Sequence, residues 1–306
     1  MKEEHNWGWP IASYLFLGGL GGGMIVVAGL ADLAFGRGEL FSLGSLLAGI
    51  AVAIGSALLV FELGRPFRFW RVLSRQKAIM TAGAWMLSFT ILTSLAHFSF
   101  WPDFSPWRHL VGVRHFFSGM NIVLGLGVCI YTGILLGSLR ARAFWNTPLL
   151  PVLFLVSGIS TGVAAQSLLA GSWPCRAAAG DLAAVHAALR SCDLALLVFE
   201  LIIVFTYVGM MRLSAGPLTA RIAAQWLTGP KKWLFWGGLV GVGLVLPGVL
   251  YGLRAGGETT AFLVLMGGVV LRFLVVSSDE RAELPGEAEY YSRLPHADAP
   301  FLKAWE

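Results

Sequence analysis

The chain has 306 residues, of which 57% are hydrophobic and 13% are charged, and its mean hydropathy is +0.73. This composition lies far from that of a soluble globular domain and excludes a soluble enzyme built around one large core. The formal net charge is +5. The basic residues stand in short loops between apolar runs, however, which excludes a basic patch or arm that binds nucleic acid.

Eight runs of apolar residues follow one another along the chain, each about 20 residues long and so able to cross roughly 30 Å of hydrocarbon. They predict an all-α integral membrane protein with eight transmembrane helices, embedded in lipid. The predicted spans are residues 10–35, 41–63, 79–100, 115–137, 148–170, 186–212, 232–254 and 259–278. The first run lacks a small-residue cleavage site, so we expect it to remain as a helix.

An even number of spans places both termini on one face of the membrane, together with the loops after the second, fourth and sixth helices. We call this the terminal face, and the other the opposite face. Of the 22 Lys and Arg residues, 15 fall on the terminal face and six on the opposite face. The positive-inside rule therefore predicts cytoplasmic termini, although a basic face can also dock an acidic partner.

An internal repeat organises the chain. The string ALLVFEL occurs at 57–63 and again at 195–201, an offset of 138 residues. The same offset relates Pro10 to Pro148 and places Glu62 and Glu200 at equivalent positions. Since four spans separate the copies, the repeat predicts two parallel-duplicated four-helix bundles rather than an inverted repeat.

The predicted units are a first bundle at 1–137, a second bundle at 138–278 and a soluble tail at 279–306. The tail is rich in acidic residues and ends with aromatic ones. It is either disordered or an arm that docks a partner, because aromatic residues are enriched at interfaces.

The sixth predicted helix carries ionisable residues at intervals of seven. Seven residues make about two turns with roughly 20° of drift, so the four side chains share one broad stripe. A row of this kind at membrane depth is typical of a proton path. The alternative is an Arg190–Asp193 pair, with Glu200 bonded to a neighbouring helix. The stripe consists of His186, Asp193, Glu200 and Tyr207.

A second set of polar and aromatic residues gathers at the terminal face. A quinone headgroup needs two hydrogen-bonding partners, an apolar wall and a route from lipid, and this set could supply all three. The alternatives are interfacial belt aromatics and a membrane-boundary cap. The first helix also carries two overlapping GxxxG steps, which predict close helix packing. The candidate quinone residues are Trp9, Tyr14, Glu62, Arg65 and Tyr131.

Histidines and cysteines lead to a further alternative and to one exclusion. His97, His109 and His115 fall at the opposite face, and with His186 they could ligate one b-type haem. The three cysteines (Cys129, Cys175 and Cys192) form no CxxC pair, so they can build neither an iron–sulfur cluster nor a thiolate zinc site within this chain. Cys175 and Cys192 are expected as free thiols or, on an extracytoplasmic face, as a disulfide.

Several segments together resemble the NrfD/PsrC family, the quinone-reactive integral membrane subunits of the polysulfide reductase type. They are WGWPIASYLFLGGLGGG (7–23), ELGRPFRFW (62–70), GAWMLSF (83–89), NTPLLPVLFLVSGISTG (146–162) and the stretch from Gly267 to Arg272.

The resemblance implies two helix bundles in a bacterial inner membrane, a menaquinone or ubiquinone site near one face, and no covalently bound cofactor. It also implies a ferredoxin-like partner with four-iron clusters, and with it a molybdopterin-type catalytic subunit. Quinone residues on the first and fourth helices would here be Trp9, Tyr14 and Tyr131.

The leading hypothesis is thus a quinone-reactive membrane subunit of an oxidoreductase complex of anaerobic respiration, inert on its own. It would exchange electrons between quinone and an iron–sulfur partner, with proton transfer along the sixth helix. Relatives with exported catalytic subunits keep the quinone site on the outer side, whereas the charge count places the terminal face inside. A proton or ion transporter without a redox partner is the alternative.

Overall fold

The computed structural model describes residues 8–62, 79–139, 142–172, 179–213, 216–255 and 257–280. Within these ranges all regular structure is helical, and eight helices are long and apolar enough to cross a membrane. This confirms the predicted all-α membrane architecture. The eight spans are Trp9–Phe35, Gly38–Phe61, Ile79–Ser99, Val111–Gly137, Leu149–Leu169, Asp181–Leu213, Trp233–Gly252 and Gly257–Val276.

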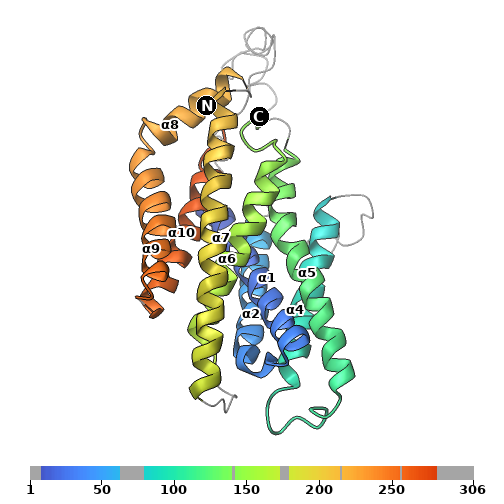
Figure 1. The fold of residues 1–306 in the computed structure, drawn as a ribbon. Helices are drawn as coiled ribbons and strands as arrows, with labels where there is room; N and C mark the ends of the chain where they lie inside the picture. The colour runs from blue at the N-terminus through green and yellow to red at the C-terminus, as the bar shows by residue number, and fades with distance from the viewer. Residues whose placement is uncertain are drawn as a thin grey trace, which may run out of the picture.

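Figure 1 shows these helices side by side. The elements are α1 (Trp9–Phe35), η1 (Gly38–Phe41), α2 (Ser42–Glu62), α4 (Ile79–Ser99), α5 (Val111–Gly137), α6 (Leu149–Leu169), α7 (Ala179–Leu213), α8 (Pro217–Leu227), η3 (Trp233–Val245), α9 (Leu246–Gly252) and α10 (Gly257–Val276). The segment η3 is π-helical, and it forms the seventh span together with α9.

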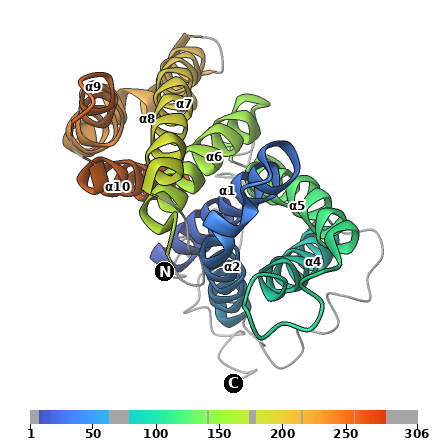
Figure 2. The same cartoon turned by 60° about the horizontal axis from the view of Figure 1, so that its bottom comes forward.

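The helices form two groups, which Figure 2 shows on either side of α1 and α6. In the first group α1 packs against α2 and α5, and α4 packs against both of these neighbours; in the second, α6 packs against α7 and α10, and η3 packs against both. The helices α1 and α6 join the groups. This arrangement is the one that a parallel duplication would give, but the duplication itself stays a prediction.

The two groups meet where glycines let the backbones of α1 and α6 touch. A Cβ atom at Gly23 would lie 2.0 Å from the carbonyl oxygen of Gly158, and one at Gly162 would lie 2.3 Å from the backbone of Gly23. On the next face of α1, a Cβ atom at Gly22 would lie 2.8 Å from the Gly125 oxygen of α5. The predicted GxxxG steps therefore serve packing against two different helices.

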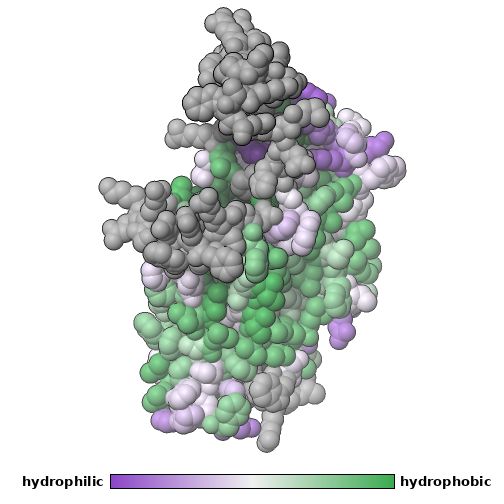
Figure 3. Space-filling model, turned by 180° about the vertical axis from the view of Figure 1, so that it is seen from behind, coloured by the Kyte–Doolittle hydropathy of each residue, from purple (hydrophilic) through white to green (hydrophobic). Residues whose placement is uncertain are grey.

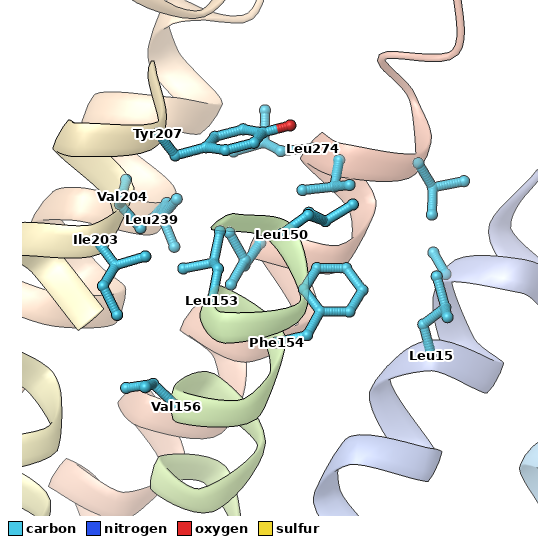
Figure 4. Packing of buried hydrophobic residues seen from close by; sticks show 14 of the residues in the cluster. Leu15, Leu150, Leu153, Phe154, Val156, Ile203, Val204, Tyr207, Leu239 and Leu274 are labelled. Atoms are coloured by element: carbon cyan, nitrogen blue, oxygen red, sulfur yellow. The ribbon is translucent and has the colours of Figure 1, made fainter. Parts of the chain in front are cut away.

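Apolar side chains fill the centre of the second group and cover the outside of the molecule. Figure 4 shows Leu150, Leu153 and Phe154 of α6 between Val204 of α7 and Leu15 of α1. Figure 3 shows a broad hydrophobic surface across the middle, with hydrophilic residues toward both ends. This distribution is the one expected of a protein whose middle lies in lipid.

Among the described residues, the terminal face contains one helix that the sequence does not predict. The loop after the sixth span forms α8, which crosses one end of the molecule (Figure 1). Its Trp226 is fully buried and donates a hydrogen bond to Ser278 Oγ at 2.8 Å. Nearby, Trp145 donates to the Val275 oxygen at 2.8 Å, and Tyr207 donates to the Phe144 oxygen at 2.6 Å.

Lys231 completes this layer. Its ammonium group donates to the Ser277 oxygen at 2.5 Å. Burial lowers the pKa of Lys231 below its ordinary value, and the Glu280 and Asp279 carboxylates oppose that shift. The layer ties the end of α10 to α8. Residues 281–306, which include most of the predicted tail, lie outside the described residues.

Candidate functional site

Two tyrosines meet inside the first helix group at its terminal-face end. Tyr14 of α1 and Tyr131 of α5 are buried, with 1% and 8% of their surfaces exposed, and they are close enough to influence each other electrostatically. The hydroxyl of Tyr14 has no hydrogen-bond partner among the described residues. A buried hydroxyl of this kind is ready to donate to a ligand oxygen.

The sequence makes room for this pair with small residues. A Cβ atom at Gly83 of α4 would lie 1.9 Å from Tyr131 Cζ, so any larger residue there would displace the ring. Gly55 of α2 lies against Tyr14, since its Cβ atom would stand 3.6 Å from Tyr14 Cδ2. Four helices therefore enclose the two rings.

Of the other three predicted quinone residues, one lies away from the tyrosine pair, and two lie wholly or partly outside the described residues. Trp9 begins α1 and is 68% exposed, as a residue of the interfacial belt would be. Glu62 ends α2, but its side chain lies outside the described part of the structure, and so does the whole of Arg65. Of the three candidates whose side chains are described, the structure brings together Tyr14 and Tyr131.

Two members of the predicted α7 stripe are buried against neighbouring helices. Asp193 is 1% exposed and accepts a hydrogen bond from Ser160 of α6 at 2.7 Å. The Tyr251 side chain of α9 approaches the same carboxylate. Its partners are therefore a serine and a tyrosine, rather than the Arg190 of the alternative interpretation.

Glu200 lies two helical turns farther along α7 and is 3% exposed. Its carboxylate approaches Ser157 of α6 and the guanidinium group of Arg272. Asp193 and Glu200 are about 10.5 Å apart along the helix axis, and the two acidic groups influence each other. Both carboxylates are thus buried among neighbouring helices, while their predicted part in a proton path stays a prediction.

The ends of the predicted stripe behave differently. His186 is exposed near the start of α7 and does not share the buried face of Asp193 and Glu200. Tyr207 is fully buried, but its hydroxyl is held by the Phe144 oxygen. The buried polar row consequently comprises the two carboxylates and the residues around them.

Arg272 of α10 is the cation of this row. It is 1% exposed, hydrogen-bonds to Ser157 Oγ, and donates to the Phe154 oxygen at 3.4 Å. Its guanidinium carbon lies 5.0 Å from the centre of the Phe154 ring. A buried charge without compensation is costly in lipid, so Arg272 and Glu200 stabilise each other through Ser157.

The same guanidinium group links the row to α1. A Cβ atom at Gly19 would lie 3.1 Å from Arg272 Nη2. Gly19 follows Tyr14 by five residues, which is about 7.5 Å along the helix axis. Arg272 of the second group thus reaches the first group at a point of α1 about two turns or less from Tyr14.

Comparison with known proteins identifies the family. The family model described as "Polysulphide reductase, NrfD" matches residues 1–278. The C component of polysulfide reductase from Wolinella succinogenes is 31% identical, with 90% of this chain and 95% of that protein aligned. The chain belongs to the NrfD family. The resemblance found in the sequence is thereby confirmed, and the chain is a multi-pass integral membrane protein.

Other NrfD relatives differ in the complexes that their names denote. Protein NrfD of Escherichia coli is 29% identical, with 90% of this chain and 95% of that protein aligned. The C component of selenate reductase from Mesobacillus selenatarsenatis is 22% identical, with all of this chain and 82% of that protein aligned. Two of the three relatives are therefore named as the C component of a reductase.

The opposite-face end of this NrfD chain holds a buried cluster of polar residues, of which the sequence predicted only the histidines. Asp32 of α1 is 1% exposed and accepts a hydrogen bond from Ser118 at 2.6 Å and from Arg114 Nε at 3.2 Å. Two of the predicted histidines face it: His97 Nε2 lies 3.7 Å from Asp32 Oδ2, and His115 Nε2 lies 4.0 Å from Asp32 Oδ1.

One signal could have pointed to Asp32, since it is the only charged residue in the first predicted span. Its partners stand on α4 and α5, which the sequence alone does not place beside it. His97 is fully buried, and Ser45 Oγ occupies its other nitrogen, Nδ1, at 3.1 Å. This arrangement argues against His97 as an axial haem ligand, because both ring nitrogens face protein groups.

The remaining cysteine expectation is settled only in part. Cys192 is a free, exposed thiol on α7 and Cys129 is free and buried. Cys175 lies outside the described residues, so of the two cysteines the structure shows only Cys192, as the expected free thiol and not in a disulfide.

Proposed function

We propose that this NrfD-family chain is the quinone-reactive membrane subunit of a respiratory oxidoreductase complex. The observation that carries the proposal is the buried pair of Tyr14 and Tyr131, with the Tyr14 hydroxyl free to donate among the described residues. Two relatives are named as the C component of polysulfide and selenate reductases, which supports a partnership with a catalytic complex.

The tyrosine pair fits the headgroup of menaquinone or ubiquinone. A quinone carbonyl accepts hydrogen bonds, the phenolic hydroxyls donate them, and the enclosing helices are apolar. Bound quinone would supply two-electron, two-proton chemistry. Tyr14 and Tyr131 would orient the headgroup and exclude water from around it, while Gly83 keeps the space that the Tyr131 ring needs.

Proton transfer along α7 is the second part of the proposal. Tyr251, Asp193 and Ser160 form a polar group in the half of the membrane nearer the opposite face, and Glu200, Ser157 and Arg272 form another nearer the tyrosine pair. Protons would pass between the two carboxylates through water, and Arg272 would stabilise the charged form of Glu200.

The quinone site would exchange electrons with another subunit. No CxxC pair or cysteine cluster in the sequence could hold an iron–sulfur cluster. A ferredoxin-like subunit with four-iron clusters is therefore the partner that we propose, joined to a molybdopterin-type catalytic subunit. The excess of Lys and Arg on the terminal face would attract an acidic docking surface there.

Conservative tyrosine variants test the quinone site. Tyr14→Phe and Tyr131→Phe remove single hydroxyls from the complex in native membranes. Each should raise the quinone KM about tenfold, the equivalent of one hydrogen bond. The change should appear in the KM for quinone, with the yield of assembled complex close to that of the wild type.

Tyr207→Phe is the matched control. It removes a buried hydroxyl that binds the Phe144 oxygen, away from the tyrosine pair, and should leave the quinone KM unchanged. An unchanged KM in both Tyr14→Phe and Tyr131→Phe would contradict the assigned site. Ion flux through the purified chain in liposomes, without a redox partner, would favour the transporter alternative.

A further inference from the structure

The cluster around Asp32 lies in the other half of the first helix group, away from the tyrosine pair. Arg114 Nη2 lies 3.1 Å from Asp32 Oδ1, and the guanidinium group stacks 4.5 Å from the centre of the Trp101 ring. A buried carboxylate that served only to hold the fold would need no more than this pairing. Asp32 instead also faces two histidines at 3.7 and 4.0 Å.

The two histidines differ in their access to water. The His115 side chain is 42% exposed, whereas the His97 and Asp32 side chains are fully buried. Asp32 therefore stands between an outer imidazole and an inner one. Among the described residues, the cluster's ionisable groups are Asp32 from α1, His97 from α4, and Arg114 and His115 from α5, while α2 contributes the uncharged Ser45, which contacts His97.

Polar groups continue inward from His97 along the interior of the first helix group. Thr90, Ser94 and His97 follow one face of α4 at helical spacing, and all three are fully buried. Neither amide atom of the buried Asn121 on α5 has a partner among the described residues, and the Thr90 hydroxyl has none either. Buried polar groups of this kind usually bind ordered water.

The row ends at an apolar layer. Leu87 is the next residue on the same face of α4 and is 4% exposed, and beyond it Gly83 touches Tyr131. The polar groups thus reach from the opposite face toward the tyrosine pair, and Thr90, the last of them on α4, lies about two helical turns from Gly83.

We propose that His115, Asp32 and His97 form a proton-exchange site at the mouth of a water-filled route that enters the first helix group from the opposite face. A proton passes from water to the His115 imidazole, across the Asp32 carboxylate, and onto His97 Nε2. The His97 imidazolium is then held between the Asp32 carboxylate and the Ser45 hydroxyl. Only a proton moves, and no electron donor or acceptor is needed.

This route is separate from the α7 row, which lies in the second helix group. Under the 138-residue offset, Asp32 and His97 correspond to Ala170 and Phe235, so the second group has no counterpart of the cluster. Whether water fills this route does not depend on the proposed function. That protons pass along it during quinone-linked turnover rests on the proposed function.

Silver-ion accessibility tests the hydration. In a background with Cys175→Ala and Cys192→Ala, single Ser94→Cys and Thr90→Cys variants place thiols along the row. Ag⁺ added to the full-length chain in nanodiscs should block both thiols from later labelling after denaturation. The native Cys129, fully buried at the α1–α5 contact, is the internal control and should stay free. Thiols at positions 94 and 90 as unreactive as Cys129 would overturn the proposal.

Chemical rescue tests the relay in the assembled complex. His97→Gly should lower quinone-linked turnover about tenfold or more, and added imidazole should restore part of it. The exposed His109 is the control, and His109→Gln should behave like the wild type with and without imidazole. Rescue by imidazole is not expected if His97 only supports the fold.

Either of two results would overturn the relay: wild-type turnover in assembled His97→Gly, or lost turnover that imidazole does not restore. If His97→Gly does not assemble, Asp32→Asn takes its place, and wild-type turnover in that variant overturns the relay. A wild-type complex without quinone-linked turnover would contradict the proposed function instead, and the silver-ion result would still decide the hydration.

Discussion

At the scale of single residues, Arg272 determines whether Glu200 can carry a charge in the membrane. The two groups meet through Ser157, and each is almost fully buried. Removing one partner of a buried ion pair leaves the other charge uncompensated, which costs far more than the pair contributes to stability. The pair should therefore respond to substitution in a strongly non-additive way.

We expect Arg272→Gln to lower the free energy of unfolding by about 3–5 kcal/mol, because Glu200 is left as an unpaired buried carboxylate. Glu200→Gln alone should assemble, since an amide can replace the carboxylate in size, but it should lose most quinone-linked turnover. Thermal unfolding in detergent and turnover of the assembled complex measure the two effects.

The double variant Arg272→Gln with Glu200→Gln is the control. It should recover a large part of the stability lost in Arg272→Gln, because no uncompensated charge remains. Strictly additive losses would show that the two residues do not interact. Wild-type turnover in an assembled Glu200→Gln complex would remove Glu200 from the proton path.

The residue scale is also where prediction from sequence reached its limit. Asp193 and Glu200 are recognisable because they are acidic residues at helical spacing inside an apolar run. His186 shares their spacing but is exposed, because it lies near the start of the long helix α7. Asp32 and His97 are 65 positions apart in the chain, and only the packing of α1 against its neighbours reveals their contact.

At the scale of elements, the glycine contacts of α1 fix how the two helix groups join. Backbone atoms of α1 and α6 touch at Gly23, Gly158 and Gly162. In addition, Gln166 of α6 donates a hydrogen bond to the Met24 oxygen of α1 at 2.8 Å. Small residues and interhelical hydrogen bonds are the usual means of association where lipid removes the hydrophobic driving force.

We expect Gly23→Ala to destabilise the protein by about 1–3 kcal/mol or more, because the added methyl group would overlap the Gly158 oxygen. Gly119→Ala on α5 is the matched control. A Cβ atom there meets nothing within 4 Å, and alanine favours the helix by roughly 0.5–1 kcal/mol. Thermal unfolding in the same detergent compares the stability of the two variants. Equal stability of Gly23→Ala and Gly119→Ala would argue against the close contact between Gly23 and Gly158.

The spans themselves were predictable because a membrane helix is defined by length and apolarity, which a sequence displays directly. The helix α8 was not, since its 11 residues are amphipathic and too short to span the bilayer. Its burial depends on Trp226 fitting among Phe144, Tyr207 and Phe235, which come from three other segments. No pattern in the sequence of α8 itself indicates a contact with such distant segments.

At the scale of the whole molecule, the two helix groups are joined through space more extensively than through the chain. The α1–α6 contact, the Gln166 hydrogen bond and the exposed Arg37–Asp181 ion pair at 3.0 Å all connect them. One short connection after α5 links them covalently. Noncovalent contacts alone should therefore hold the halves together.

We expect fragments 1–140 and 141–306, expressed together, to assemble and co-purify, because each buries its polar and glycine-rich face against the other. Either fragment alone should be degraded or aggregate. Recovery of a tagged fragment with its partner from membranes is the measurement. Failure to co-purify, with both fragments present in the membrane, would show that the covalent link is required.

We propose that this chain handles quinone within a larger redox complex. Purification of the tagged chain from native membranes in mild detergent tests this proposal. Every co-purifying subunit would be identified, and bound iron and quinone would be quantified. We predict recovery with an iron–sulfur subunit and with quinone that Tyr14→Phe and Tyr131→Phe reduce. Recovery of the chain alone, without iron or quinone, would contradict the account.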